Sequence, residues 1–205
     1  NERMGPYPPV IPQREFFEHT PANKRFDALV KQACESPVSS LSGITPWLLS
    51  FCERALAHTG KKHLHDIWPH LQFILHAGVD FKPYQKRFEA LLQRPVTFVE
   101  NYTATEGFLG IQDLAQAGLR CLPQHGLFYE FVKVSERHLE RPTRYALWQV
   151  EAQQDYSLFI TNLAGFWSVE VGDILRFSQT HPYPLFQVKG RVQDKCDFFG
   201  EKLLV

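Results

Sequence analysis

The sequence lacks a net charge and lacks any long apolar run. Lys plus Arg and Asp plus Glu both number 22, and this balance argues against a protein dominated by nucleic-acid or membrane-surface contacts. No apolar run approaches the roughly 20 residues that a membrane-spanning helix needs. The remaining composition, 44% hydrophobic and 21% charged over 205 residues, is typical of an ordinary globular protein. We therefore expect no nucleic acid and no membrane among its partners.

Several catalytic signatures are also absent. The chain has no Gly-x-x-x-x-Gly-Lys-Ser/Thr phosphate loop, no Gly-x-Ser-x-Gly turn and no His-Glu-x-x-His helix. Four histidines do lie close together in the sequence: His63, His65, His70 and His76. A zinc site needs three or four ligands in a defined geometry, so we expect these to be ordinary surface or core histidines.

Cysteine is sparse as well. Cys34, Cys52, Cys121 and Cys196 are scattered along the chain, and none pair at metal-ligand spacing. This pattern favours free thiols in a reducing compartment, and hence a cytoplasmic location. The sequence alone does not exclude a disulfide.

The first half of the chain has the pattern of an α/β protein. Five prolines before residue 22 predict an extended segment over residues 1–22. Apolar periodicity predicts helices over 24–35, 46–58 and 83–93, and strands over 38–44, 71–76 and 96–100. Helices and strands joined in this order by short loops indicate a parallel sheet flanked by helices over about residues 24–110.

The second half is richer in strands. After Gly126, strands are predicted over 127–134, 145–150, 156–162, 166–171, 173–178 and 184–190, with turns at Gly165, Gly172 and Pro182. We therefore expect a mostly antiparallel β region over residues 126–192, and an α/β fold class for the whole.

The densest chemistry lies in residues 101–110, directly after the predicted strand 96–100. Tyr102, Thr103, Thr105 and Glu106 bring an aromatic ring, hydroxyls and a carboxylate into one short segment with two glycines. Polar loops at strand ends are where open α/β sheets bind ligands. The segment is therefore predicted to be a ligand-binding loop.

Each candidate site residue also has a plain structural explanation. Gly78 would permit a tight turn, Tyr102 would be a core aromatic, Asp173 would satisfy turn backbone groups, and Arg191 would be a solvated strand residue. Only the ordered set of segments favours a common function.

That ordered set resembles the adenylate-forming enzymes, and most closely the auxin-responsive Gretchen Hagen family of acyl acid amido synthetases, in its bacterial branch. The family's Tyr-x-x-Ser/Thr-Glu segment corresponds to residues 102–106, and its Gly-Asp-x-x-Arg segment to residues 172–176. Its Gly-Arg pair before the hinge corresponds to Gly190-Arg191. A Trp68-Pro69 segment with His76-Ala77-Gly78-Val79 after it is also similar, and the resemblance covers roughly residues 36–204.

The resemblance implies a nucleotide site. Tyr102 would stack on adenine, and the backbone around Gly78 and Val79 would line the other side of the base. Asp173 would accept hydrogen bonds from both ribose hydroxyls. Arg191 would contact the ribose or the phosphates as a donor fork.

The same resemblance implies a catalytic turn and an acyl pocket. Thr105 would donate a hydrogen bond to the α-phosphate or the acyl carboxylate, and Glu106 would hold Mg²⁺. Trp47, Leu48 and Phe108 would form an apolar wall for the acyl group, although a plain core role for these three stays open.

The implied reaction has two steps and uses ATP and Mg²⁺. A carboxylic acid is activated as acyl-AMP, and an amine such as an amino acid then displaces AMP. Two alternatives remain open: a catalytically inactive member of the fold that binds a nucleotide or a protein partner, and an unrelated α/β binding protein with chance motifs.

Two parts of the family pattern have no counterpart here: the Ser/Thr/Gly-rich phosphate loop and the C-terminal lid. We therefore expect residues 1–22 to be an extended segment, 23–192 a partial large domain, and 193–205 the hinge and the start of a lid. On this view the 205 residues alone are inactive or nearly so, and an exposed sheet edge predicts self-association.

Overall fold

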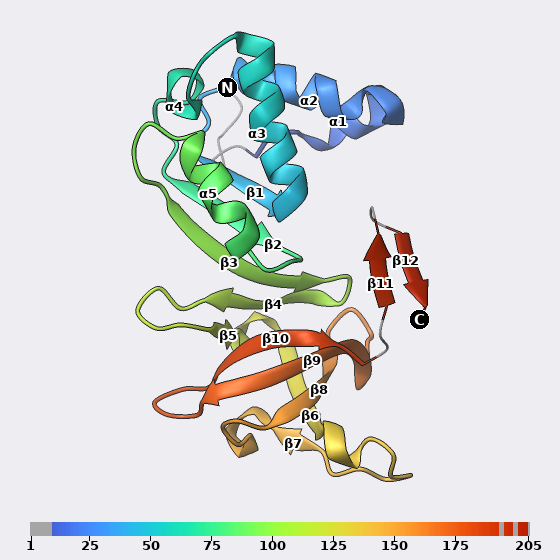
Figure 1. Ribbon diagram of the computed structural model, residues 1–205. Helices are drawn as coiled ribbons and strands as arrows, with labels where there is room; N and C mark the ends of the chain where they lie inside the picture. Colours follow the sequence, from blue (N-terminus) through green and yellow to red (C-terminus); the bar gives the residue numbers. More distant parts are fainter. Residues whose placement is uncertain (1–9, 193–194, 199–200, 205) are drawn as a thin grey trace. The chain divides into compact units, whose positions relative to one another are not determined.

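The computed structural model describes residues 10–192, 195–198 and 201–204 (Figure 1). It divides between Phe98 and Val99 into two compact units, which we describe separately. The predicted fold class is confirmed, since parallel strands with helices come first and antiparallel strands follow. The predicted hinge and lid segment, residues 193–205, lies partly outside the described residues.

The first unit is mainly helical around two parallel strands. Its elements are α1 Arg14–His19, η1 Ala22–Lys24, α2 Arg25–Cys34, β1 Ser40–Ile44, α3 Thr45–Thr59, α4 Leu64–Ile67, β2 Phe73–Ala77 and α5 Lys82–Ala90. Strands β1 and β2 pair in parallel, with Leu41 opposite Ile74. The predicted helices over 24–35, 46–58 and 83–93 are confirmed. The prediction of an extended 1–22 segment is wrong over α1.

The start of α3 joins the helix to the sheet. Pro46 lies in the first turn of α3, as expected for a residue with no N–H to donate. The Thr45 hydroxyl donates a hydrogen bond of 3.1 Å to the carbonyl of Ala77, the last residue of β2. The helix therefore begins where the neighbouring strand ends.

Trp68 is the largest fully buried side chain of the first unit. Its indole Nε1 donates a hydrogen bond of 2.8 Å to the Ala33 carbonyl at the end of α2. Its ring stacks on Phe51 of α3, with centroids 6.0 Å apart and planes at 4°. One side chain thus ties two helices together by packing and by satisfying a buried carbonyl.

The second unit is a curled antiparallel sheet, and β3 Thr97–Ala104 is its first strand. The further strands are β4 Gly107–Gln112, β5 Leu119–Cys121, β6 Leu127–Lys133, β7 Tyr145–Ala146, β8 Asp155–Asn162, β9 Val169–Gln179 and β10 Leu185–Arg191, with 3₁₀ turns η2 Pro123–His125, η3 Val134–Glu136 and η4 Leu147–Gln149. The spatial order is β3-β4-β5-β10-β9-β8-β6-β7. Strands β11 Lys195–Phe198 and β12 Glu201–Leu204 pair antiparallel as a separate hairpin.

Three sequence expectations need correction in this unit. The predicted strands 166–171 and 173–178 form the single strand β9, because the backbone at Gly172 continues instead of turning. The predicted strand 145–150 is only β7, followed by η4. Antiparallel pairing begins with β3 and β4, well before residue 126.

One side-chain contact shows that the sheet is strongly curled. Strands β3 and β9 are four places apart in the sheet order, which in a flat sheet would separate them by about 19 Å. Yet the hydroxyl of Tyr102 in β3 lies 2.7 Å from Oδ2 of Asp173 in β9. The sheet therefore folds back on itself around a core that includes Phe131, Phe177 and Phe186.

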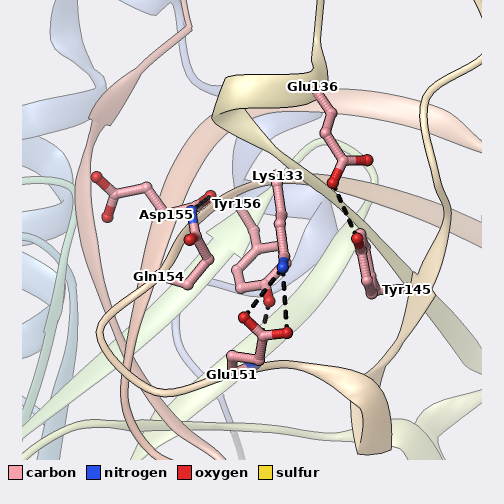
Figure 2. Close-up of polar contacts among 7 residues, drawn as sticks. All are labelled: Lys133, Glu136, Tyr145, Glu151, Gln154, Asp155 and Tyr156. Carbon is pink, nitrogen blue, oxygen red and sulfur yellow. Dashed lines mark hydrogen bonds and ion pairs between the residues drawn. The ribbon is translucent and has the colours of Figure 1, made fainter.

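A cluster of polar side chains lies where β6 ends and β8 begins (Figure 2). Nζ of Lys133 lies 3.1 and 3.0 Å from the two carboxylate oxygens of Glu151, and this pairing raises the pKa of Lys133. The Tyr156 hydroxyl accepts from the Glu151 backbone N–H at 3.0 Å. Tyr145 donates to Glu136 at 2.9 Å. Each polar group of the cluster has a partner, so the cluster serves the fold.

Cys34, Cys52 and Cys121 are free thiols, as predicted, while the side chain of Cys196 lies outside the described set. Burial raises the pKa of Cys52 to about 12. Within the described residues, none of the helices combines the length and apolar character that crossing a membrane would require.

Replacing Trp68 by Ala should destabilise the protein strongly. The change opens a large cavity and leaves the Ala33 carbonyl without its donor, so we expect a loss of about 3–5 kcal/mol. Trp148 is 78% exposed, and W148A should change stability by less than about 0.5 kcal/mol. Urea unfolding of both variants measures the difference, and equal midpoints would contradict this account of the first core.

Candidate functional site

Three of the predicted site residues meet in the second unit. Tyr102 comes from β3, Asp173 from β9 and Arg191 from the end of β10. The Tyr102 hydroxyl donates to Asp173 Oδ2 at 2.7 Å, and Arg191 Nε donates to Asp173 Oδ1 at 2.9 Å. The Asp173 side chain is 9% exposed and that of Arg191 40% exposed. The result is a nearly buried carboxylate with one partner on each oxygen.

The backbone of β9 departs from a regular strand at the residue before this carboxylate. Gly172 has φ +85°, and a Cβ added there would meet nothing within 4 Å, so only the backbone conformation favours glycine. The pairing of β8 with β9 shifts register between Ser157 and Phe159, opposite this point. Bulges of this kind re-aim side chains next to functional sites. Here the bulge sets the direction of Asp173.

Tyr102 is largely buried beside Asp173. The residue is 8% exposed, and its ring packs edge-on against Phe186 with centroids 5.9 Å apart. Burial, and then the neighbouring Asp173 charge, raise the pKa of Tyr102 far above its ordinary value. The phenol therefore stays protonated and acts as a donor. In this structure its hydroxyl holds Asp173, and stacking of its ring on adenine stays a prediction.

The predicted loop over residues 101–110 is a β-hairpin. Tyr102 lies inside β3, and Thr105 and Glu106 are the two residues that connect β3 to β4. Thr105 is exposed, Glu106 is partly exposed, and Phe108 at the start of β4 is exposed as well. The hydroxyl and the carboxylate are thus presented together at the tip of a tight turn.

The described surroundings of Glu106 do not form a closed metal site, but its carboxylate is compatible with Mg²⁺. Among the described residues, no three His, Cys, Asp or Glu side chains converge. Mg²⁺ commonly uses one or two carboxylates together with substrate phosphates and several waters. The partly exposed Glu106 carboxylate is a donor of the kind that Mg²⁺ would use in such a site.

The other predicted nucleotide residues belong to the first unit. Gly78 follows β2 with φ +89°, and a Cβ there would come within 3.2 Å of the Ile44 side chain. Val79 is 43% exposed. The backbone at this bend is accessible because glycine keeps it clear.

The first unit also contains an apolar cavity of about 330 Å³. The predicted acyl-pocket residues Trp47 and Leu48 both line it, and Trp47 is largely exposed. Its other lining residues come from the N-terminal segment, α2, β1 and α3, and include Ile11, Phe26, Leu29, Leu41, Ser42 and Phe51. The cavity has the size and apolar character of a small-ligand pocket.

Two histidines of the first unit, His65 and His76, are buried. His65 Nε2 lies 3.3 Å from the Leu71 carbonyl, and its Nδ1 accepts from the Gln93 backbone N–H at 3.2 Å. His76 stacks on Phe81 with ring centroids 4.1 Å apart. Burial lowers the pKa of His76 to about 4.

Sequence reasoning missed one residue next to the hairpin tip. The side chain of Asn162, at the end of β8, donates to the Glu106 carbonyl at 3.0 Å. The only signal was an Asn before the Leu163-Ala164-Gly165 turn, which also suits an ordinary turn residue.

The comparisons with known proteins find one family model and several solved structures. Residues 121–191 match the GH3 family central domain. The solved structure of the GH3.15 acyl acid amido synthetase aligns with a TM-score of 0.57 and 16% identity, over 90% of this chain and 42% of that chain. A 2-hydroxyisobutyryl-CoA ligase in complex with 2-HIB-AMP and CoA aligns with a TM-score of 0.65 and 13% identity, over 90% and 39%.

A third structure, the Vibrio cholerae adenylation domain AlmE with glycyl-adenosine-5'-phosphate, aligns with a TM-score of 0.54 and 11% identity, over 90% of this chain and 37% of that chain. At identities this low, the structural similarity establishes a shared fold and nothing more. The chain spans less than half the length of each of these proteins. A search of curated proteins finds no match.

Replacing His76 by Gln should reduce the loss of stability in mild acid. The folded-state pKa is about 4 and the ordinary value is 6.5, so the unfolded chain binds more protons between these values. The free energy of unfolding is not reduced by His76 above pH 6.5. As the pH drops from 6.5 toward 4, protonation of this residue in the unfolded chain lowers the free energy of unfolding by up to about 3 kcal/mol. Unfolding midpoints from pH 7.5 to 4.5 measure this. H58Q, at an exposed position of α3, is the control and should keep the wild-type slope; an unchanged slope in H76Q would refute the assignment.

Proposed function

We propose that this chain, which has the fold of the adenylate-forming ligases and matches the GH3 family central domain over residues 121–191, belongs to an ATP-dependent acyl acid–amido ligase. The observation that carries the proposal is the Asp173 carboxylate, held by Tyr102 and Arg191 in a fold whose relatives have been solved with adenylates. The function of the whole protein is adenylation of a carboxylic acid followed by transfer to an amine.

Asp173 is the proposed acceptor for the ribose hydroxyls. A carboxylate has about four acceptor sites, and Tyr102 and Arg191 use one each, so two remain for a diol. Arg191 contacts the ribose or phosphate side as a fixed donor. Tyr102 orients Asp173, and its ring stays the proposed stacking surface for adenine. Gly78 and Val79 are also proposed contacts of the base.

The proposed catalytic turn is Thr105-Glu106. The oxygen of the acyl carboxylate attacks the α-phosphorus of ATP, and the bond from this phosphorus to the bridging oxygen breaks to release pyrophosphate. The Thr105 hydroxyl donates to the α-phosphate or the carboxylate, and Glu106 holds Mg²⁺, which supplies charge stabilisation when bound. The amine nitrogen then attacks the acyl carbon, AMP leaves, and the nitrogen loses a proton.

The apolar cavity of the first unit is the proposed site for the acyl group. Trp47 and Leu48 line it together with aromatic and aliphatic side chains of α2 and α3. A volume of about 330 Å³ suits a medium-sized aromatic or aliphatic acid. Phe108, which is exposed at the start of β4, stays a proposed acyl-binding residue. A cytoplasmic location is also proposed, supported by the three free thiols.

Asp173→Asn should weaken ATP binding by the full-length protein about 10- to 100-fold, the worth of a hydrogen bond to a charged group. Asp155→Asn is the matched control, because Asp155 in the neighbouring strand makes a two-point pair with Arg176, at 2.6 Å for each contact. D155N should bind ATP like the wild type, as titration calorimetry would show.

Pyrophosphate exchange with a panel of carboxylic acids tests the chemistry. Exchange that depends on one acid is the expected result. ATP binding without any exchange would indicate the inactive nucleotide-binding alternative, and equal ATP binding by wild type and D173N would remove Asp173 from the site.

Ser42→Phe should raise the KM for the acid at least several-fold while leaving ATP binding unchanged. Ser42 is exposed and lines the cavity, so a phenyl ring there fills space that the acyl group would occupy. Ser50→Phe, on the exposed part of α3, is the control. An unchanged KM in S42F would place the acyl group elsewhere.

A further inference from the structure

Asn162 makes an unusual number of hydrogen bonds for a partly exposed turn residue. Its side-chain oxygen accepts from the backbone N–H groups of Ala164 at 2.9 Å and Phe166 at 3.3 Å. Its own backbone N–H donates to the Phe166 carbonyl at 3.0 Å, and its carbonyl accepts from Gly165 at 3.3 Å. These contacts close the loop between β8 and β9.

The remaining donor of the same side chain leaves that loop. Nδ2 of Asn162 donates to the carbonyl of Glu106 at 3.0 Å, across 56 positions of sequence. One amide group therefore joins the β8–β9 loop to the tip of the β3–β4 hairpin. An amide is suited to this role because it carries an acceptor and a donor on one rigid plane.

The hairpin tip has a second anchor beside the first. A Cβ added at Gly107 would lie 3.3 Å from Cδ2 of Leu127, so the backbone after Glu106 rests directly on the first residue of β6. Leu127 is also the residue paired with Asn162 across β6 and β8. The two anchors thus come from one strand pair and fix the peptide on both sides of the Glu106–Gly107 bond.

The Glu106 carboxylate itself is left for a ligand. Within residues 10–192, the Glu106 side chain forms no hydrogen bond and no ion pair. Its backbone carbonyl, in contrast, accepts the hydrogen bond from Asn162. Fixing the peptide fixes the Cα–Cβ direction, and hence the region that the carboxylate can reach. A metal ligand set this way loses less conformational freedom on binding.

We propose that Asn162 is a positioning residue for the Thr105-Glu106 turn, and that its Nδ2–Glu106 hydrogen bond sets the magnesium affinity of the enzyme–ATP complex. The inference rests on the proposed function, because it assumes that Glu106 holds Mg²⁺. Asn162 itself contacts neither the nucleotide nor the metal.

Two substitutions remove the donor and keep the acceptor. Asn162→Asp and Asn162→Ser can both still accept from the loop N–H groups, but neither can donate to the Glu106 carbonyl, the serine because it is too short. In the full-length enzyme both should raise the Mg²⁺ concentration at half-maximal pyrophosphate exchange about 5- to 10-fold, the factor for the loss of about 1 kcal/mol. ATP affinity measured without metal should stay within twofold of the wild type.

Gly165→Ala is the control for a purely structural role. Gly165 has φ +101° with open space around it, so alanine strains the β8–β9 loop, in which the Gly165 N–H donates to the Asn162 carbonyl, but it keeps the Nδ2 donor to Glu106. G165A should lose stability yet keep the wild-type Mg²⁺ dependence. In a Glu106→Gln background, the shift caused by Asn162→Ser should disappear.

The outcomes separate cleanly. A shift in both Asn162 variants but not in G165A supports the proposal. A shift only in N162D would indicate a charge effect and overturn it, as would a shift of equal size in G165A, or one that persists beside Glu106→Gln. A wild-type protein without exchange would instead count against the proposed function.

Discussion

The hydrogen bond between Tyr102 and Asp173 is the contact on which the second unit depends. A carboxylate that is 9% exposed is costly unless its oxygens are paired. Tyr102 and Arg191 supply the two partners, but Tyr102 comes from a strand four places away in the sheet. The curl of the sheet and the bulge at Gly172 are the conditions under which this carboxylate is stable in the core.

The sequence was sufficient to predict the class of fold and to select three residues that lie together. Tyr102, Asp173 and Arg191 were selected because their segments occur in a particular order, and the structure brings them together. The family resemblance is confirmed by the match over residues 121–191. Helices such as α3 were predictable because proline and apolar periodicity act locally. These features depend on neighbours in the chain or on motif order.

What the sequence could not supply depends on tertiary contacts. An aromatic residue in a polar segment suits both a stacking surface and a core, and only the curl of the sheet places Tyr102 against Phe186. Gly172 suggested a turn, because glycine at positive φ is common in turns; its place inside β9 is a bulge that alternation does not reveal. Asn162 has no distinguishing local pattern, since its partner Glu106 is remote in sequence.

The hydrogen bond from Tyr102 also bears on the proposed nucleotide site. Asp173 is suited to binding the ribose hydroxyls, because its two bonded oxygens are already oriented and still have acceptor sites. The tyrosine thus reduces the ordering that a ligand must impose on the carboxylate, and the pair Tyr102–Asp173 would act as one preorganised acceptor.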